Sequence, residues 1–179
     1  MAAADGGGGD VRVAVLGTGI MGSAMARNPA AAGLRTVVWD RSPSAAARLS
    51  VVGALVAASP TEAVRDAPVV ITMLPTAEVV NSVIFARGVA QAFAEGAVRA
   101  QMGTIGVTAT TEAAGRLGQL RPDVMLVDAP VSGSRGPAEA GQLLILASGP
   151  AAAEQVVSPV FSAIGARPCG WVRPGRAAG

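Results

Sequence analysis

A glycine-rich turn between an apolar run and a segment of small residues constrains the fold of this chain more than any other feature. The apolar run covers residues 11–16, and the turn that follows it reads Gly17-Thr18-Gly19-Ile20-Met21-Gly22. A second apolar run leads into Asp40-Arg41-Ser42, about 20 residues beyond the turn. The order strand, glycine turn, helix, strand and acid predicts a βαβ unit that binds a dinucleotide.

Each glycine of this turn has a mechanical role in such a unit. Gly17 permits the tight turn out of the strand, Gly19 leaves room for the pyrophosphate, and Gly22 lets the helix pack closely. The N-terminus of the helix then presents free N–H groups and its positive dipole end to the phosphates. An ordinary glycine-rich turn is the alternative, but the strands, the helix and the acid around it favour the dinucleotide.

Composition fits a helix-covered sheet. Of the 179 residues, 51% are apolar and 3% are aromatic, which suits helices packed on a mostly parallel sheet. The sequence contains no run of 18 apolar residues, so we expect no membrane span. Residues 1–10 lack the features of a secretory signal, and we expect a flexible tail there. The one cysteine, Cys169, fits a cytoplasmic protein.

Three missing residue types exclude several kinds of chemistry. The sequence contains no His, no Tyr and no Lys, and all 14 of its basic residues are Arg. A Ser-His-Asp triad, a Tyr-Lys pair and a histidine-based hydroxyacid dehydrogenase mechanism are therefore impossible, and we expect no metal site. The arginines are scattered and have few aromatic neighbours, so we expect no nucleic-acid partner.

Apolar runs alternate with segments of helical pattern along the chain. This alternation predicts an α/β fold of the Rossmann type, with a doubly wound, mostly parallel sheet. Beyond the first βαβ unit we expect strands at 68–74, 97–102, 124–128 and 143–147. We expect helices at 44–52, 61–66, 77–85, 107–120 and 151–164. Pro29 lies inside the first helix, and we expect the helix to kink or fray from Arg27 onward.

Four segments together resemble the β-hydroxyacid dehydrogenase family, the relatives of 6-phosphogluconate dehydrogenase and 3-hydroxyisobutyrate dehydrogenase. The segments read GTGIMGSAMARN, TMLPTAEVV, QMGTIG and DAPVSGSRGPAEAGQLLILASG. They fall in the family's order across nearly the whole chain. The segments PVSGS, PAE and GQL resemble the matching segments of the glyoxylate and succinic-semialdehyde reductases, which are NADPH-dependent reductases of small aldehyde acids.

The resemblance implies roles for individual residues. It places the pyrophosphate turn at Gly17, Thr18, Gly19, Ile20, Met21 and Gly22. It places Leu74 and Pro75 along the cofactor near the adenosine-side ribose, and Thr104 beside the nicotinamide. The donors to a substrate carboxylate would be Ser132, Gly133 and Ser134. The alternative for this last group is an ordinary polar turn after a strand.

The residues that follow the second strand leave the choice of cofactor open. Asp40 would accept hydrogen bonds from the ribose hydroxyls of NAD and would repel a 2′-phosphate. Arg41 and Ser42 could bind that phosphate, and arginine can do so with two parallel hydrogen bonds. The reductase branch has Asn where this chain has Asp40, but shares the arginine. We expect NADP, with NAD as the alternative.

The resemblance also implies what the chain lacks. In the family a lysine on a long helix after the nucleotide domain handles the proton of the substrate oxygen, and this sequence contains no lysine. We expect residues 11–172 to form the dinucleotide-binding domain, and residues 173–179 to be a truncated entry to that interdomain helix. The family's C-terminal helical domain would then be missing. We assign no catalytic residue, because Asp128 and Glu139 are weak candidates.

Two broad interpretations follow. The chain is an NAD(P)-dependent oxidoreductase of this family, present as its cofactor domain and weakly active or inactive alone. The alternative is a non-catalytic NADP-binding module, or the remnant of a truncated gene. In either case we expect self-association through an exposed apolar surface near the C-terminus, which would comprise Val156, Val160, Ile164 and Trp171.

Overall fold

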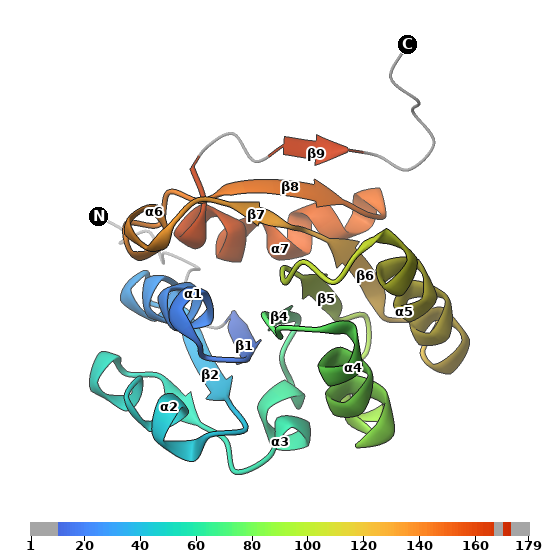
Figure 1. The fold of residues 1–179 in the computed structure, drawn as a ribbon, viewed down its shortest axis with the longest axis horizontal. Coiled ribbons are helices and arrows are strands. Elements are labelled where there is room, and N and C mark those ends of the chain that lie inside the picture. Colours follow the sequence, from blue (N-terminus) through green and yellow to red (C-terminus); the bar gives the residue numbers. More distant parts are fainter. Residues whose placement is uncertain (1–10, 167–169, 173–179) are drawn as a thin grey trace, which may run out of the picture.

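The computed structural model describes residues 11–166 and 170–172, and its sheet extends in both directions from β1 (Figure 1). The strand order is β3-β2-β1-β4-β5-β6-β8-β7, and β9 pairs with β8. The pairs from β3 to β6 are parallel, whereas β8 runs antiparallel to β6 and β7. The strands are β1 (Arg12–Leu16), β2 (Arg35–Trp39), β3 (Leu55–Val56), β4 (Val69–Thr72), β5 (Val98–Gln101), β6 (Met125–Asp128), β7 (Val131–Ser132), β8 (Leu144–Ser148) and β9 (Gly170–Val172).

Helices connect these strands. The α-helices are α1 (Ile20–Ala31), α2 (Pro43–Ala47), α3 (Pro60–Val64), α4 (Ala77–Val80), α5 (Val107–Leu120), α6 (Arg135–Glu139) and α7 (Ala151–Ile164). Segments of other helix types are η1 (Ser50–Val52), η2 (Asn81–Ala86), which is a π-helix, and η3 (Val89–Ala92). Side-chain oxygens of Ser59 and Thr76 cap α3 and α4 by accepting hydrogen bonds from backbone N–H groups in the first turn.

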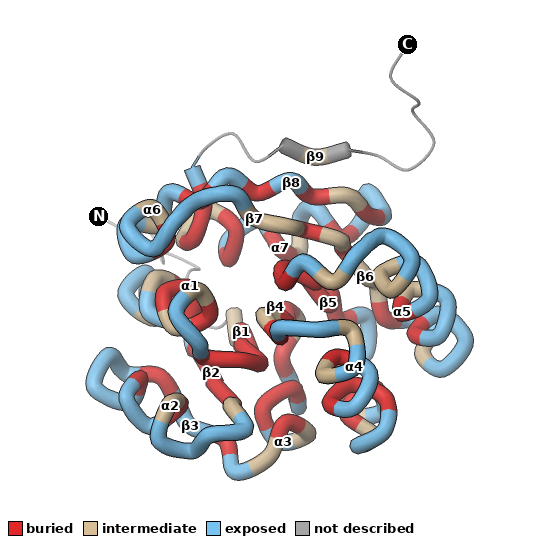
Figure 2. The backbone as a smooth tube through the Cα atoms, viewed as in Figure 1, coloured by how far each residue is buried: buried red, intermediate tan, exposed pale blue. Residues whose placement is uncertain are grey.

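The core lies on both faces of the sheet, as expected for buried parallel strands (Figure 2). Successive residues of β1 alternate between the faces: Val13 and Val15 pack on one side, and Ala14 and Leu16 on the other. The first face is covered by α1 and α7, and the second by α3, η2, η3 and α5. The expected α/β fold with a doubly wound, mostly parallel sheet is therefore confirmed.

Pro29 does not fray the first helix, so the fraying expected from Arg27 onward does not occur. The helix continues to Ala31, and the carbonyls of Asn28 and Pro29 still accept hydrogen bonds from Ala32 and Leu34. Pro29 is buried, and the neighbouring Asn28 side chain donates to the carbonyl of Ala138 in α6 at 2.8 Å. Packing and this long-range bond hold the last turn in place despite the proline.

Other boundaries differ in detail from the sequence expectation. The short strand β3 was not predicted, because two apolar residues give no periodicity to read. The helix expected at 44–52 divides into α2 and η1, and the one expected at 77–85 becomes a π-helix at Asn81. None of the helices in the described ranges has the length and apolar content needed to cross a membrane.

The apolar surface expected near the C-terminus is not exposed as predicted. Val160 and Ile164 are fully buried because α7 turns them toward the sheet, and Val156 and Trp171 are half-buried against the same core. The large apolar side chains exposed in this part of the fold are instead Leu144 and Leu146, which alternate with buried residues along β8. The expected flexible tail and the truncated helix entry lie outside the described residues.

Candidate functional site

A cavity of about 760 Å³ opens at the carboxyl ends of β1, β2, β4 and β5. The strand order reverses between β1 and β4, and open α/β sheets bind ligands at such a reversal. We call this space the switch-point cavity. It is lined by Gly17, Gly19, Ile20, Met21, Gly22, Trp39, Asp40, Arg41, Met73, Leu74, Pro75, Glu78, Val79, Ser82, Val83, Arg87, Gly103 and Thr104.

The three glycines of the turn after β1 are there for different reasons. Gly17 has φ +95°, and a Cβ at this position would collide with the carbonyl oxygen of Met73. A Cβ on Gly22 would collide with the carbonyl oxygen of Gly17. A Cβ on Gly19 would meet no atom of the chain within 4 Å. Gly17 and Gly22 thus satisfy packing inside the protein, whereas Gly19 leaves space only for something in the cavity.

The start of α1 offers uncapped donors to the same cavity. Gly19 is the N-cap residue, no side chain caps the helix, and the first turn contains no acidic residue. The amide of Ser23 is the first to bond back along the chain, to the carbonyl of Gly19 at 2.8 Å. The earlier N–H groups and the positive end of the helix dipole therefore remain available to an anion.

Asp40 fixes the glycine turn to the end of β2. Its Oδ2 accepts a hydrogen bond from the backbone N–H of Thr18 at 2.6 Å and another from the Thr18 hydroxyl at 3.0 Å. Its Oδ1 accepts from the backbone N–H of Ser42 at 2.8 Å. The carboxylate that should meet the ribose thus already holds three donors from the chain itself.

A buried polar network supports the turn after β5, at the end of the cavity away from Asp40. The Gln101 side chain accepts from the Thr72 hydroxyl at 2.8 Å and from the Arg99 guanidinium at 2.6 Å, and donates to the carbonyl of Gly103 at 2.9 Å. The backbone N–H of Gly103 also donates to the carbonyl of Thr72. These bonds hold the turn that presents Thr104 at the end of β5.

Arg99 is the costly member of that network. Its side chain is fully buried, and burial lowers the pKa of the guanidinium to about 10. Its Nε and Nη1 atoms have no hydrogen-bond partner in the described part of the chain. A buried charge without a counter-ion is destabilising. Burial of Arg99 therefore lowers the stability of the fold, while its hydrogen bond to Gln101 helps to order the turn before Thr104.

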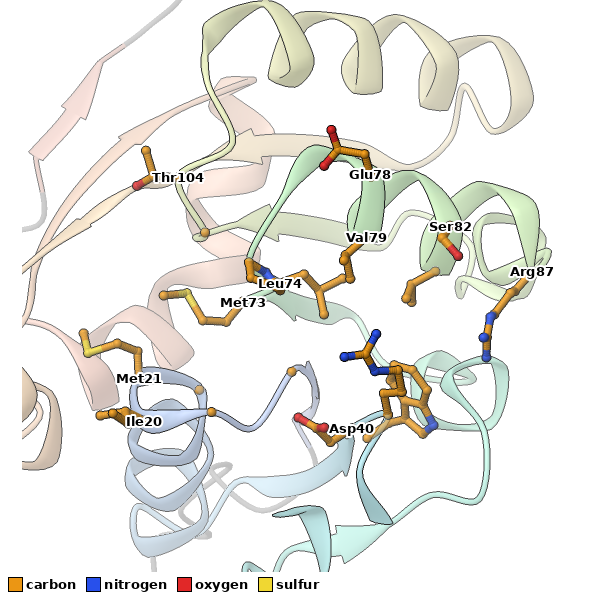
Figure 3. A pocket seen from close by; sticks show the side chains of 18 residues that line it. Ile20, Met21, Asp40, Met73, Leu74, Glu78, Val79, Ser82, Arg87 and Thr104 are labelled. Carbon is orange, nitrogen blue, oxygen red and sulfur yellow. The ribbon is translucent and has the colours of Figure 1, made fainter. Parts of the chain in front are cut away.

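The second wall of the cavity begins in the TMLPTAEVV segment, where the sequence analysis assigned only Leu74 and Pro75 to the cofactor. Figure 3 shows Glu78, Val79, Ser82 and Arg87 coming from α4, η2 and the residue that follows η2. The pairs Glu78 with Ser82 and Val79 with Val83 are four residues apart, so they share one helix face. The helical spacing of these residues, which begins inside the TMLPTAEVV segment, was the sequence signal that could have identified them. Trp39, Met73 and Gly103 also line the cavity without having been predicted.

Most of the residues assigned to the cofactor meet in this cavity. They are Gly17, Gly19, Ile20, Met21, Gly22, Asp40, Arg41, Leu74, Pro75 and Thr104. Thr18 and Ser42 do not line it: the Thr18 hydroxyl donates to Asp40, and the Ser42 hydroxyl shares a hydrogen bond with the hydroxyl of Ser44. In the described part of the chain, no group of three His, Cys, Asp or Glu side chains is placed to hold a metal ion.

The residues assigned to the substrate lie elsewhere. Ser132, Gly133 and Ser134 are exposed in the turn between β7 and α6 and do not line the cavity. Arg135 beside them is paired with Glu139 at 2.7 Å. Asp128 ends β6, as expected, and burial raises the pKa of its carboxyl.

Comparisons with known proteins agree with this geometry. A family model described as the NAD binding domain of 6-phosphogluconate dehydrogenase matches residues 12–172. Glyoxylate/succinic semialdehyde reductase 1 of Arabidopsis thaliana is 35% identical over 162 residues, which cover 88% of this chain and 54% of that protein.

Solved structures share the fold. A 3-hydroxyisobutyrate dehydrogenase from Salmonella typhimurium superposes with a TM-score of 0.82 at 32% identity, over 92% of this chain and 56% of that one. The protein Psf3, in complex with NADP⁺ and 2-OPP, gives 0.82 at 25% identity, over 90% of this chain and 57% of that one. The chain thus spans about half the length of these relatives. The chain belongs to the β-hydroxyacid dehydrogenase family and matches its NAD-binding domain.

Proposed function

We propose that the chain binds NADP in the switch-point cavity and supplies the cofactor half of an oxidoreductase of the β-hydroxyacid dehydrogenase type. The reaction would transfer a hydride between the nicotinamide and a small hydroxy acid or aldehyde acid. The observation that carries the proposal is Gly19, whose missing side chain leaves room for a ligand but for no part of the chain. The uncapped start of α1 supports it, because a pyrophosphate would satisfy those free donors.

The state of Asp40 supports NADP over NAD. A carboxylate offers about four acceptor positions, and three donors of the chain already occupy Asp40. Little capacity is left for the ribose hydroxyls of NAD. Arg41 lines the cavity with an exposed guanidinium, which suits a 2′-phosphate. NAD remains the alternative, to be decided by the ratio of the two dissociation constants.

These 179 residues alone are proposed to bind cofactor and to turn substrate over slowly or not at all. Hydride transfer to a carbonyl leaves an oxyanion that needs a proton, and the sequence contains no lysine or histidine to give one. Asp128 has a raised pKa but does not line the cavity. General acid–base catalysis is typically worth about 10²–10⁴-fold in rate, so its loss would be conspicuous. A non-catalytic module, or a gene remnant, is the alternative.

Three finer assignments belong to the same proposal. Residues 11–172 would form the dinucleotide-binding domain. The turn of Ser132, Gly133 and Ser134 would donate hydrogen bonds to the substrate carboxylate, as successive N–H groups on a turn can. Self-association stays a prediction, although the residues first proposed for it are largely buried. Light scattering would test it, and a monodisperse monomer would count against it.

One experiment separates the interpretations of the function. NADPH is titrated into the purified chain and followed by its fluorescence, and reduction of glyoxylate and succinic semialdehyde is then assayed. Saturable binding without turnover supports the cofactor half that we propose. Turnover at the rate of an ordinary enzyme would contradict the importance of the missing proton donor. Absence of binding by the folded chain would support a remnant.

A further inference from the structure

Arg87 lies at the end of the switch-point cavity where the adenosine half of a dinucleotide belongs. In a βαβ site the acid that ends the second strand marks the adenosine ribose, and here that acid is Asp40. Figure 3 shows Arg87 and Ser82 toward the same end of the cavity as Asp40, with Ile20, Met21 and Thr104 toward the other. Arg87 therefore approaches the ribose from the wall opposite β2.

The guanidinium of Arg87 is free to bind a ligand. The residue is the C-cap that follows the π-helix η2, its side chain is exposed, and its guanidinium forms no hydrogen bond or ion pair with any described residue. Arg41, which lines the cavity from the end of β2, is likewise exposed and unpaired within the described ranges. Other guanidinium groups of the chain are paired, for example those of Arg121 with Asp123 and of Arg135 with Glu139.

The carboxylates around this end do not cancel these two charges. Asp40 is held by Thr18 and Ser42 in three hydrogen bonds, which spread its negative charge over donors of the chain. Glu78 also lines the cavity, but in Figure 3 its carboxylate points away from Arg87. Hydrogen bonding by the Thr76 side chain lowers the pKa of the Glu78 carboxyl.

We propose that Arg87 and Arg41 bind the 2′-phosphate of NADP from opposite walls of the cavity, so that Arg87 is a residue that determines cofactor specificity. The inference rests on the proposed function and deepens it. A phosphate dianion accepts hydrogen bonds from two guanidinium groups, each in a bidentate arrangement. The segment after β4 then contributes to the choice between NADP and NAD, a choice that sequence reasoning assigned to the residues after β2 alone.

The test uses ligands that differ only in the 2′-phosphate. Dissociation constants of adenosine 2′,5′-bisphosphate and adenosine 5′-monophosphate are measured by calorimetry for the unmodified chain and for Arg87→Gln, and those of NADPH and NADH are compared in parallel. We expect Arg87→Gln to weaken the bisphosphate and NADPH by about tenfold or more, as for one lost charge-assisted contact, and to leave the other two ligands unchanged. Arg87→Lys should keep part of the affinity, because it keeps the charge.

Arg27→Gln is the matched control, since the Arg27 side chain on α1 is exposed, pairs with no described residue and does not line the cavity. It should change none of the four constants. Equal weakening of all four ligands by Arg87→Gln, or no weakening of any, would overturn the role of Arg87 while leaving the cofactor proposal in place. If the folded, unmodified chain bound neither NADPH nor NADH, the proposed function would fail, and the inference with it.

Discussion

The turn after β1 and the turn after β7 are alike in sequence and different in structure. Both are rich in small residues, both follow a strand and both precede a helix. The first lies at the strand-order reversal, leads into the 12 residues of α1 and lines a cavity. The second is exposed, leads into the five residues of α6 and lines none of that cavity. Place in the sheet, and not composition, sets the first turn against a cavity.

The largest effect on stability should come from a side chain added at Gly22, in the turn after β1. Gly22→Ala would drive a methyl group into the carbonyl of Gly17, and we expect it to lower the free energy of unfolding by about 2–3 kcal/mol. Urea denaturation followed by circular dichroism measures the change. Gly118→Ala in α5 is the control, because Gly118 is exposed with nothing near its Cβ position and should gain roughly 0.5–1 kcal/mol. Equal effects of the two variants would contradict the packing role of Gly22.

Gly19→Ala should separate ligand binding from folding. Gly19 has φ −63°, which alanine adopts without strain, and its new methyl group would face only the cavity. We expect the unfolding free energy to stay equal or rise slightly, and the dissociation constant of NADPH to increase by about tenfold or more, or about 1.4 kcal/mol. Fluorescence titration and urea denaturation of the same preparation give both numbers. Unchanged NADPH affinity would argue against a pyrophosphate at this glycine.

Arg99→Met should stabilise the protein. The buried guanidinium has no counter-ion among the described residues and two unsatisfied nitrogen atoms, and methionine fills a similar volume without a charge. We expect a gain in unfolding free energy of about 1–3 kcal/mol at neutral pH. The pKa of Arg99 is lowered to about 10, so the charged form is disfavoured by folding and its cost is fully present below that pH. The cost should recede as the pH rises from about 10 toward the unfolded value.

Thermal unfolding of Arg99→Met against Arg48→Met checks this gain. Arg48 is exposed, so its replacement should leave stability within about 0.5 kcal/mol. A loss of stability in Arg99→Met would mean that its hydrogen bond to Gln101 outweighs the buried charge. The turn before Thr104 would then depend on the Arg99 hydrogen bond more strongly than we infer.

The smallest effect is expected in the turn after β7. Ser132→Ala and Ser134→Ala alter exposed hydroxyls that make no hydrogen bond with the described residues and line no part of the switch-point cavity. We expect changes below about 0.5 kcal/mol in stability and no change in NADPH affinity. Calorimetric titration of both variants tests this directly. A clear loss of NADPH affinity in either variant would contradict the prediction that only the turn after β1 contacts the cofactor.

Local signals account for what the sequence predicted well. The glycine spacing, the apolar run before it and the acid after the second strand lie within about 30 residues, and the structure brings them to one cavity. Two features depended on hydrogen bonds between separate elements. The Asn28 side chain beside Pro29 bonds to Ala138, and the Thr18 hydroxyl bonds to Asp40 instead of lining the cavity. Periodicity and motif spacing carry no information on such pairings.

The claim that the first turn is the cofactor site can be tested most directly by backbone amide NMR of the ¹⁵N-labelled chain titrated with NADPH. We predict saturable shifts of the amides of Gly19, Ile20, Met21 and Gly22, together with those of Leu74 and Thr104. The amides of Ser132, Gly133 and Ser134 should stay in place. Shifts confined to the turn after β7, with the amides of the glycine turn unmoved at saturation, would contradict the account.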